Sequence, residues 1–354
     1  MIPILYESNE TAFATNGLGR LRDCISCKVT EERNGIYECD FDYPVDGAHF
    51  DLIQCGRIIA VTHNDTGDVQ PFDIIGYSKP INGVVTFHCV HISYRLNGAT
   101  LLLNSGYDSI STAFAKFATA HMASQFSFES DFDSTGYIAA ADGIPRTVRQ
   151  LLGGIEGSIL DTFGGEYEWD KFKVILHKNR GTKRDFSIRY GLNMVDYNEE
   201  VDFSESYTVC IPYWTNGEEK VVATRTTINL PRWCGRDVCV PMDLSDKFDS
   251  KPTTTQLRTM AQQMLASKSP HLPKQNINVD FIRLQDVGEY ERFESLLQCR
   301  LCDSIDVVFP RYGMAGTYKI VKTEYDVLSD RYISLELGSL QVTLSEALGL
   351  GGKR

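Results

Sequence analysis

The residues best suited to acid–base chemistry in this chain are two glutamates on one predicted strand. Glu166 and Glu168 are separated by one residue in the segment GEYEWDKF, and Asp161 lies a few positions before them. Same-face neighbours on a strand lie ~7 Å apart, near the carboxylate separation of inverting glycosidases. Acidic side chains that neighbour each other on a solvent-exposed hairpin are much more common. We therefore expect an exposed hairpin here and no glycosidase site.

Cysteine spacing offers a second possible chemistry. Two C-x-x-C pairs, Cys24/Cys27 and Cys299/Cys302, could supply the four thiolates of a zinc site. Each pair lies in or beside a predicted strand, where positions i and i+3 point to opposite faces, and no glycine turn flanks either pair. A redox-active pair would need a strand–motif–helix context, which neither has. We expect all the cysteines to be reduced, structural thiols.

Histidines and glycines provide weaker signals. His88 and His91 look like a ligand pair in the segment HCVH, but strand alternation places them on opposite faces. Glycines at 153, 154 and 157 follow no strand, as a phosphate loop would require, and the sequence contains no zinc-protease or serine-hydrolase motif. No cysteine is placed at a helix start beside a histidine. We predict no catalytic, cofactor-binding or metal-binding residue.

Composition narrows the class of protein. The chain has 354 residues, 42% hydrophobic and 23% charged, which predicts a soluble globular protein of two to four domains. Its net charge of −12 argues against sequence-independent nucleic-acid binding, which depends on lysine and arginine. No apolar run approaches the ~20 residues of a membrane span, and the start MIPILYESNE lacks a secretory signal. We expect folding in the cytosol without membrane insertion.

Strands separated by turn residues dominate the first hundred residues and return toward the end. The clearest unit is a hairpin around Asn34-Gly35, the dipeptide that best suits a type I′ turn. In its second strand, residues 37–43, Tyr37, Cys39, Phe41 and Tyr43 share one face, and the acidic residues between them share the other. Short antiparallel strands of this kind suggest a barrel or a sandwich. The predicted strands are 57–62, 69–79, 84–94, 165–178 (as a hairpin), 207–214, 220–230, 237–244, 277–283, 304–309, 317–327 and 332–337, and the predicted helices are 110–122, 147–152, 157–163, 254–267 and 343–348.

Several segments resemble one known family, in the family's order. They are ILYESNETAFATNGLGRL, CKVTEERNGIYECDFDYP, GSILDTFGGEYEWDKFKVILHKNRG with FSIRYGLNM, PMDLSDKF and LCDSIDVVFP. They resemble the phage minor structural protein group. That group is the N-terminal hub region of tail-associated lysins, or prophage tail endopeptidase family, of phages infecting Gram-positive bacteria.

The resemblance implies a fold similar to the baseplate hub of contractile-tailed phages. We expect a mainly β protein with α+β insertions, in which two related antiparallel β-barrel hub domains accompany two smaller α/β domains. The expected domains are barrel one at 1–100, an inserted α+β domain at 101–200, barrel two at 201–245 plus 300–342, an inserted helix–strand domain at 246–299 and a helical tail at 343–354.

The resemblance also implies a function and partners. We expect a homotrimeric ring at the virion tail tip or baseplate, between the distal tail protein, the tail tube or tape-measure protein, and a fibre, spike or receptor-binding protein. Genome DNA would pass through the ring, and the acidic charge predicts duplex affinity weaker than ~10⁻⁴ M. The family's endopeptidase or lysozyme activity belongs to domains C-terminal to the hub. We therefore expect no enzyme and no cofactor.

Two alternatives remain open from the sequence. One is a peptidoglycan-degrading hydrolase that would use Glu166 and Glu168 or a cysteine. The other is a carbohydrate- or receptor-binding module that would use exposed aromatic side chains. Tyr213, Trp214 and Trp233 are the candidates for that role, although buried core aromatics are the more common case.

Overall fold

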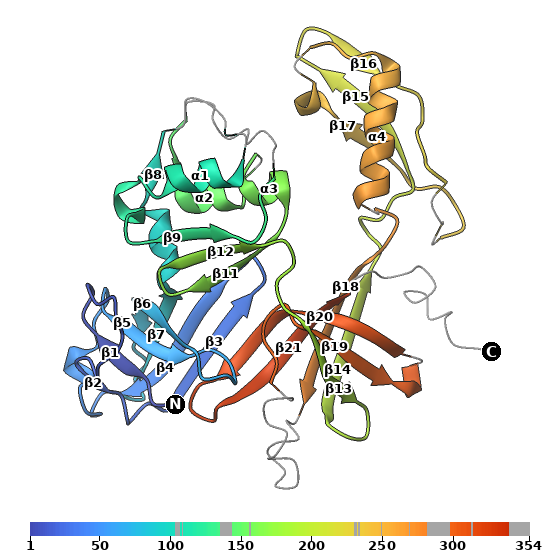
Figure 1. Cartoon of the computed structure of the whole chain (residues 1–354). Coiled ribbons are helices and arrows are strands. Elements are labelled where there is room, and N and C mark those ends of the chain that lie inside the picture. The colour runs from blue at the N-terminus through green and yellow to red at the C-terminus, as the bar shows by residue number, and fades with distance from the viewer. Residues whose placement is uncertain are drawn as a thin grey trace. The chain divides into compact units, whose positions relative to one another are not determined.

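The computed structural model divides into two compact units (Figure 1). Unit 1 comprises Met1–Asp196, Val279–Asp306 and Tyr318–Leu337, and unit 2 comprises Tyr197–Asn278, Val307–Thr317 and Gly338–Arg354. The structure describes residues 1–102, 107, 109–134, 144–155, 157–229, 232, 234–248, 250–268, 270–281, 298–312 and 314–339. Within these residues the chain is mainly β, with several antiparallel sheets, and the expected fold class is confirmed.

The main sheet of unit 1 is built largely from the N-terminal strands. Its order is β21-β20-β3-β4-β7-β6-β5-β1-β2, and neighbours from β20 to β2 run antiparallel. These strands are β1 (Ile4–Tyr6), β2 (Gly19–Arg20), β3 (Ser26–Glu32), β4 (Tyr37–Pro44), β5 (Ile58–Thr62), β6 (Val69–Ser78), β7 (Val84–His91), β20 (Met314–Asp326) and β21 (Arg331–Ser339). The C-terminal strand β20 thus pairs directly with the N-terminal hairpin.

The predicted alternation of the N-terminal hairpin is confirmed. Tyr37, Cys39, Phe41 and Tyr43 are all buried, because alternate residues of a strand face the same side. Phe41 lies opposite Phe87 of β7, and their rings stack with centroids 4.9 Å apart. Apolar burial on this face holds β3, β4 and β7 together.

Two local predictions in this region are wrong. Asn34 has positive φ but Gly35 does not, so the turn is not type I′, which needs both. Residues 33–36 connect the two strands, and the Arg33 N–H donates to the carbonyl of Val321 on β20, so tertiary pairing shapes the turn. The predicted strand 84–94 ends at His91, where a 3₁₀ helix begins.

An α+β layer completes unit 1. Figure 1 shows three short helices together beside a three-stranded sheet of order β11-β12-β9, in which β9 runs parallel to β12. Ser109, Thr147 and Ser158 cap the three helices through their side chains, as N-cap residues commonly do. The elements are β8 (Thr100–Leu101), α1 (Ile110–Phe117), β9 (Ser127–Ser130), β10 (Arg146–Thr147), α2 (Val148–Leu152), α3 (Ile159–Phe163), β11 (Glu166–Asp170) and β12 (Lys173–His177). Strand β13 (Lys183–Arg189) follows this layer in sequence and belongs to the large sheet.

Unit 2 has a small sheet with one helix packed on it. Strand β15 (Val209–Thr215) lies between β16 (Lys220–Val222) and β17 (Cys239–Asp243), antiparallel to the first and parallel to the second. Helix α4 (Thr254–Lys268) matches the predicted 254–267 almost residue for residue. The buried core contains Cys210, Trp214, Ala223, Met242, Leu244, Leu257, Ala261 and Leu265.

The remaining strands are β14 (Met194–Asp202), β18 (Lys274–Phe281) and β19 (Ser304–Phe309). The predicted strand 220–230 shortens to β16, and Thr226 adds a single bridge to Cys210. The domain boundaries given above stay predictions, and the helical tail 343–354 lies outside the described residues. No described helix combines the length and the apolar character needed to cross a membrane.

Candidate functional site: a buried charge network in unit 1

The centre of the network is a buried glutamate on the apolar face of strand β3. Glu31 follows Cys27 and Val29 on this face, and its side chain is 5% exposed. One carboxylate oxygen accepts from Arg180 Nη1 at 3.1 Å, and the other accepts from His63 Nδ1 at 3.2 Å. Burial alone would raise the pKa of Glu31. The charge of Arg180 and the contact with His63 outweigh it and hold that pKa at about 2.

Glu31 in turn stabilises the charged form of Arg180. Burial alone would lower the pKa of Arg180, but the charge of Glu31 raises it. His63 donates from Nδ1 to Glu31, and its Nε2 accepts from the amide of Asn64 at 3.0 Å. Both ring nitrogens are therefore engaged in structural hydrogen bonds. A general base needs a free ring nitrogen within reach of substrate, so His63 is not placed as one.

A second buried carboxylate lies on β11. Glu166 accepts from Lys319 Nζ at 2.7 and 2.6 Å, from Arg33 Nη1 at 3.2 Å and from the Arg180 backbone N–H at 2.7 Å. Glu166 and Lys319 are each only 7% exposed. The expected solvent-exposed hairpin is therefore wrong at Glu166. Residues distant in sequence cover this side of the hairpin. No pattern within residues 165–178 indicates that they would do so.

The other acidic candidates of the sequence have hydrogen-bond partners of their own. Glu168 Oε2 lies 2.7 Å from His177 Nε2, and His177 Nδ1 lies 2.9 Å from Asp131. Asp161 accepts from the Gly157 N–H at the start of α3 and serves as a local cap. The three acids considered for a glycosidase site thus each contact a different set of structural partners.

A short segment after β12 connects the network to the C-terminal part of the chain. Arg184 Nε donates to Asp303 Oδ2 at 2.6 Å, and the Thr182 N–H donates to Asp303 Oδ1 at 2.8 Å. Gly181, directly before Thr182, adopts φ +85°, and a Cβ there would lie 2.2 Å from the carbonyl oxygen of Cys302. Only glycine fits this close approach of two backbones.

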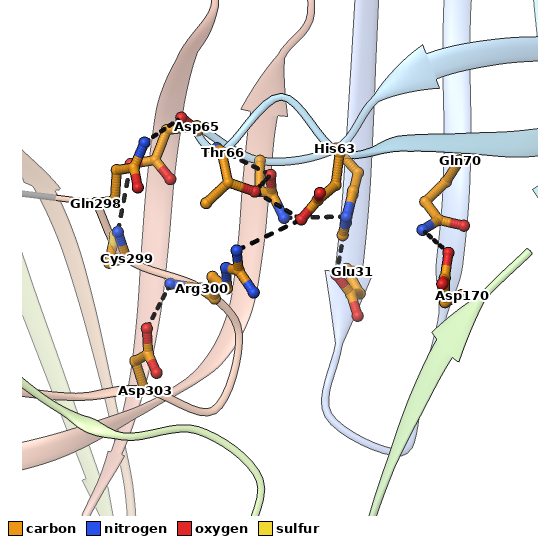
Figure 2. A network of polar contacts seen from close by, with 12 residues as sticks. Glu31, His63, Asp65, Thr66, Gln70, Asp170, Gln298, Cys299, Arg300 and Asp303 are labelled. Atoms are coloured by element: carbon orange, nitrogen blue, oxygen red, sulfur yellow. Dashed lines mark hydrogen bonds and ion pairs between the residues drawn. The ribbon is translucent and has the colours of Figure 1, made fainter. Parts of the chain in front are cut away.

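The turn between β5 and β6 provides the last set of contacts (Figure 2). Asp65 accepts from Gln298 Nε2 through its carbonyl at 3.2 Å and from the Cys299 N–H through its carboxylate at 3.3 Å. Arg300 lies 3.6 Å from Asp68, and its N–H donates to Asp303 at 2.9 Å. The segment 298–303 is thereby held on one side by the turn and on the other by residues 182–184.

These contacts surround a polar cavity of about 290 Å³. Charged and hydrogen-bonding side chains line it from the N-terminal, central and C-terminal parts of unit 1, including Glu31, Asp170 and Arg300. In the part of the chain that the structure describes, no group of three or more histidine, cysteine or acidic residues could hold a metal ion. The arrangement is a set of cross-links between distant segments.

The cysteine pairs do not supply an activated nucleophile at this site. Cys299 and Cys302 are buried beside the network, and burial raises the pKa of Cys302 to about 12 despite the nearby Arg180. A thiol with so high a pKa stays protonated and unreactive. No disulfide links the ten cysteines in the structure, and their reduced state in the protein stays a prediction.

The other cysteine pair corrects one detail of the sequence argument. Cys24 precedes strand β3, so the opposite-face rule does not apply to it. Its thiol contacts that of Cys27, and this hydrogen bond is the main cause that raises the pKa of Cys24. Cys27 Sγ in turn lies 3.7 Å from Cys39 Sγ. The three thiols form one packed group in the sheet interior.

The remaining candidates lie where strand geometry predicts. His88 is exposed and contacts Asp40 at 2.9 Å, whereas His91 is fully buried and stacks on Tyr37 with centroids 4.3 Å apart. Their opposite faces are confirmed.

Neither of the two aromatic candidates that the structure describes, Tyr213 and Trp214, is fully exposed. Trp214 is buried and donates from Nε1 to the Phe248 carbonyl at 3.1 Å, and Tyr213 is half-buried. Trp233 lies outside the described residues.

Sequence reasoning missed Glu31, Arg180 and Lys319. One signal was present for Glu31, because it continues the alternate positions of Cys27 and Val29, and an acid on an apolar face requires a buried partner. Arg180 and Lys319 are isolated cations with no comparable local pattern. Only the fold brings them to the two glutamates.

Comparison with known proteins was made for both sequence and structure. No protein-family model matches the sequence. No curated protein matches it either. The solved structures do include matches, and the most similar ones cover almost the whole chain.

Three of them are phage or bacterial tail proteins. Prophage tail protein gp18 from Listeria monocytogenes EGD-e is 13% identical with a TM-score of 0.61, covering 98% of this chain and 97% of that one. The tail protein from Neisseria meningitidis MC58 is 12% identical with a TM-score of 0.60, covering 98% of each chain. The 43 kDa tail protein of prophage MuSo2 from Shewanella oneidensis is 9% identical with a TM-score of 0.58, covering 96% and 98%. The expected resemblance is confirmed at the level of the fold, since this chain has the fold of these tail proteins over nearly its whole length.

Proposed function

We propose that this protein is a structural hub of a phage or prophage tail tip. The observation that carries the proposal is the fold shared with the Listeria prophage tail protein over 98% of this chain and 97% of that one. A match of this extent covers both units, so it includes the arrangement of elements along the chain and not one common domain. The structural role is thus inferred from the length of chain over which the fold is shared, and not from any single residue.

The buried network supports a structural role of this kind. Glu31, Glu166 and Asp303 tie the N-terminal strands, the α+β layer and the C-terminal strands of unit 1 together. Buried charges bind their partners only in one geometry, because any other arrangement leaves an unpaired charge in the interior. Such cross-links favour a single rigid shape.

The assembled form in the proposal is a homotrimeric ring. It would contact the distal tail protein and the tail tube on one side and a fibre or spike on the other. DNA would pass through the ring without specific binding, as the acidic charge of −12 per chain suggests.

The mass of the particle tests the ring. Mass photometry of the purified chain, alone and mixed with the distal tail protein from the same phage, should reveal a species of three times 39.8 kDa. A chain that stays at its monomer mass in the mixture would count against the hub proposal.

A separate assay addresses the hydrolase alternative. We expect the purified chain to release no soluble fragments from peptidoglycan, because Glu166 accepts from two cationic side chains and Glu168 contacts His177. Release of soluble fragments by the wild type but not by a Glu168→Gln variant would contradict the structural role and indicate an enzyme.

A further inference from the structure

A basic hollow lies beside the terminal strand of the main sheet in unit 1. Strand β2, labelled near the N-terminus in Figure 1, forms the end of this sheet and pairs with β1. The hollow has a volume of about 570 Å³ and is lined by Asn16, Arg20, Arg22, Ala48 and His49. Its lining contains two arginines and a histidine and, among the described residues, no carboxylate. This is a local reversal of sign on a chain whose net charge is −12.

The two arginines of the hollow are not committed to an internal partner charge. Arg20 Nε donates to the side-chain oxygen of Asn16 at 3.1 Å, and no described residue forms an ion pair with Arg20 or Arg22. Asp23, the nearest acid in sequence, accepts from the Ala48 N–H at 2.7 Å. Several other arginines of unit 1 have carboxylate partners, among them Arg33, Arg57, Arg95, Arg180 and Arg184. Arg149 instead lies over the Trp169 ring, and Arg189 donates to Ser187.

The backbone holds these side chains in place. Leu21, between the two arginines, is fully buried, and its N–H donates to the carbonyl of Pro3 at 2.9 Å. His49 adopts left-handed φ of +66° and lies against Gly19, where a Cβ would come within 2.8 Å of the imidazole ring. Arg20 ends β2 and Arg22 lies in the turn that follows, where its N–H donates to the carbonyl of Arg20 at 3.0 Å. Both arginines are exposed and line the hollow, and the buried Leu21 anchors the backbone between them.

The donors available in the hollow identify the type of ligand. The Phe50 and Leu52 N–H groups already donate to the carbonyls of Gly47 and His49, so the nearby 3₁₀ turn offers little to a phosphate. The available donors are guanidinium groups, which match a carboxylate in two-point geometry. An exposed ion pair improves affinity by at most about fivefold, and two such pairs are too weak to hold a free anion. The anion must belong to a larger ligand with further contacts.

We propose that this hollow binds carboxylate side chains of an acidic segment from a partner protein. Because β2 is the terminal strand of the sheet, an extended segment can approach beside it, and since β2 has only two residues the segment is held by side-chain charge more than by strand pairing. Acidic side chains of the segment then reach Arg20, Arg22 and His49. Opposite charge attracts such a segment to this end of the sheet, whereas the acidic remainder of the surface repels it.

A labelled hexaglutamate peptide, with hexaglutamine as its neutral counterpart, tests the proposal on the full chain by fluorescence anisotropy. Hexaglutamate should bind and hexaglutamine should not, and raising the salt should weaken the binding. The double variant Arg20→Glu/Arg22→Glu should lose at least about tenfold in affinity. The variant Arg20→Lys/Arg22→Lys keeps the charge but loses the two-point geometry, and a loss of about threefold is expected.

The matched control reverses two exposed cations elsewhere, Lys116→Glu/Arg258→Glu, with the same change in net charge. It should keep its affinity within about twofold. Equal loss in both double variants would overturn the site, because attraction would then depend on net charge alone. Unchanged binding by Arg20→Glu/Arg22→Glu, or no binding of hexaglutamate at all, would also overturn it. If millimolar inorganic phosphate displaced the hexaglutamate peptide, the ligand of the hollow would be a small anion and not an acidic segment, and the proposal would be overturned.

Discussion

The two units of this protein differ in their interiors, because unit 1 adds buried ion pairs to its apolar core, whereas the described core of unit 2 is apolar. In unit 1, Glu31, Glu166 and Asp303 link distant segments through buried ion pairs. In unit 2, β15 and α4 meet through an apolar core that includes Trp214 and Leu257. Apolar contacts are non-directional and tolerate small shifts, whereas a buried charge is stable only beside its own partner. The difference indicates that unit 1 is built for a defined geometry between its segments.

The largest effect on stability is expected from removing the central acid of the network, Glu31. Glu31→Ala leaves Arg180 buried without its carboxylate and should lower the free energy of unfolding by about 3–5 kcal/mol. Urea denaturation of unit 1, followed by hydrogen exchange in β3 and β4, measures the loss. The exposed pair Lys28–Glu324 is the control, and Glu324→Ala should cost less than about 1 kcal/mol. Equal effects would mean that the buried pair adds no stability.

A core truncation in unit 2 provides the opposite case. Leu257→Ala removes a fully buried side chain from α4 and should cost about 2–5 kcal/mol through lost burial and the cavity left behind. Hydrogen exchange should speed up in β15 and α4 while β3 and β4 keep their protection. Loss of protection in both units would show that they unfold together, contrary to the comparison.

Acid should affect the charge network specifically. The folded pKa of Glu31 is about 2, below its ordinary value of 4.5, so its contribution to stability is fully present above pH 4.5 and is lost as pH falls toward 2. The depression of the pKa corresponds to about 3 kcal/mol. In urea titrations from pH 5 to pH 2, the stability gap between the wild type and Glu31→Gln should narrow by that amount. A constant gap would show that Glu31 has an ordinary pKa.

The smallest expected effect is the difference in stability between two glycine variants, which separates the cost of backbone strain from the cost of close packing. Gly181→Ala and Gly191→Ala both place a side chain at φ near +80°, but only the first meets another backbone, at Cys302. The left-handed strain of about 1–2 kcal/mol is common to both, and Gly181→Ala should cost about 1–3 kcal/mol more. Thermal unfolding of the pair measures the difference. Equal costs would mean that residues 181 and 302 are not in close contact.

The elements themselves were predictable because their signals are local. Helix α4 and strands β4 and β19 appear within one or two residues of the predicted ranges, since periodicity and turn residues lie within each segment. The turn at Asn34 was predicted in place but not in type. Its conformation depends on the hydrogen bond from Arg33 to Val321, which no local pattern contains.

The sequence by itself determined the β-rich character, the faces of the hairpin and the opposite orientation of His88 and His91, because strand alternation is a property of the backbone. Only the tertiary structure decided the environment of Glu166. Its partners Arg33 and Lys319 are 133 and 153 residues away in the chain, and ion pairing requires approach within a few ångströms. An acid that looks exposed in sequence became a buried cross-link because the fold placed two cations beside it.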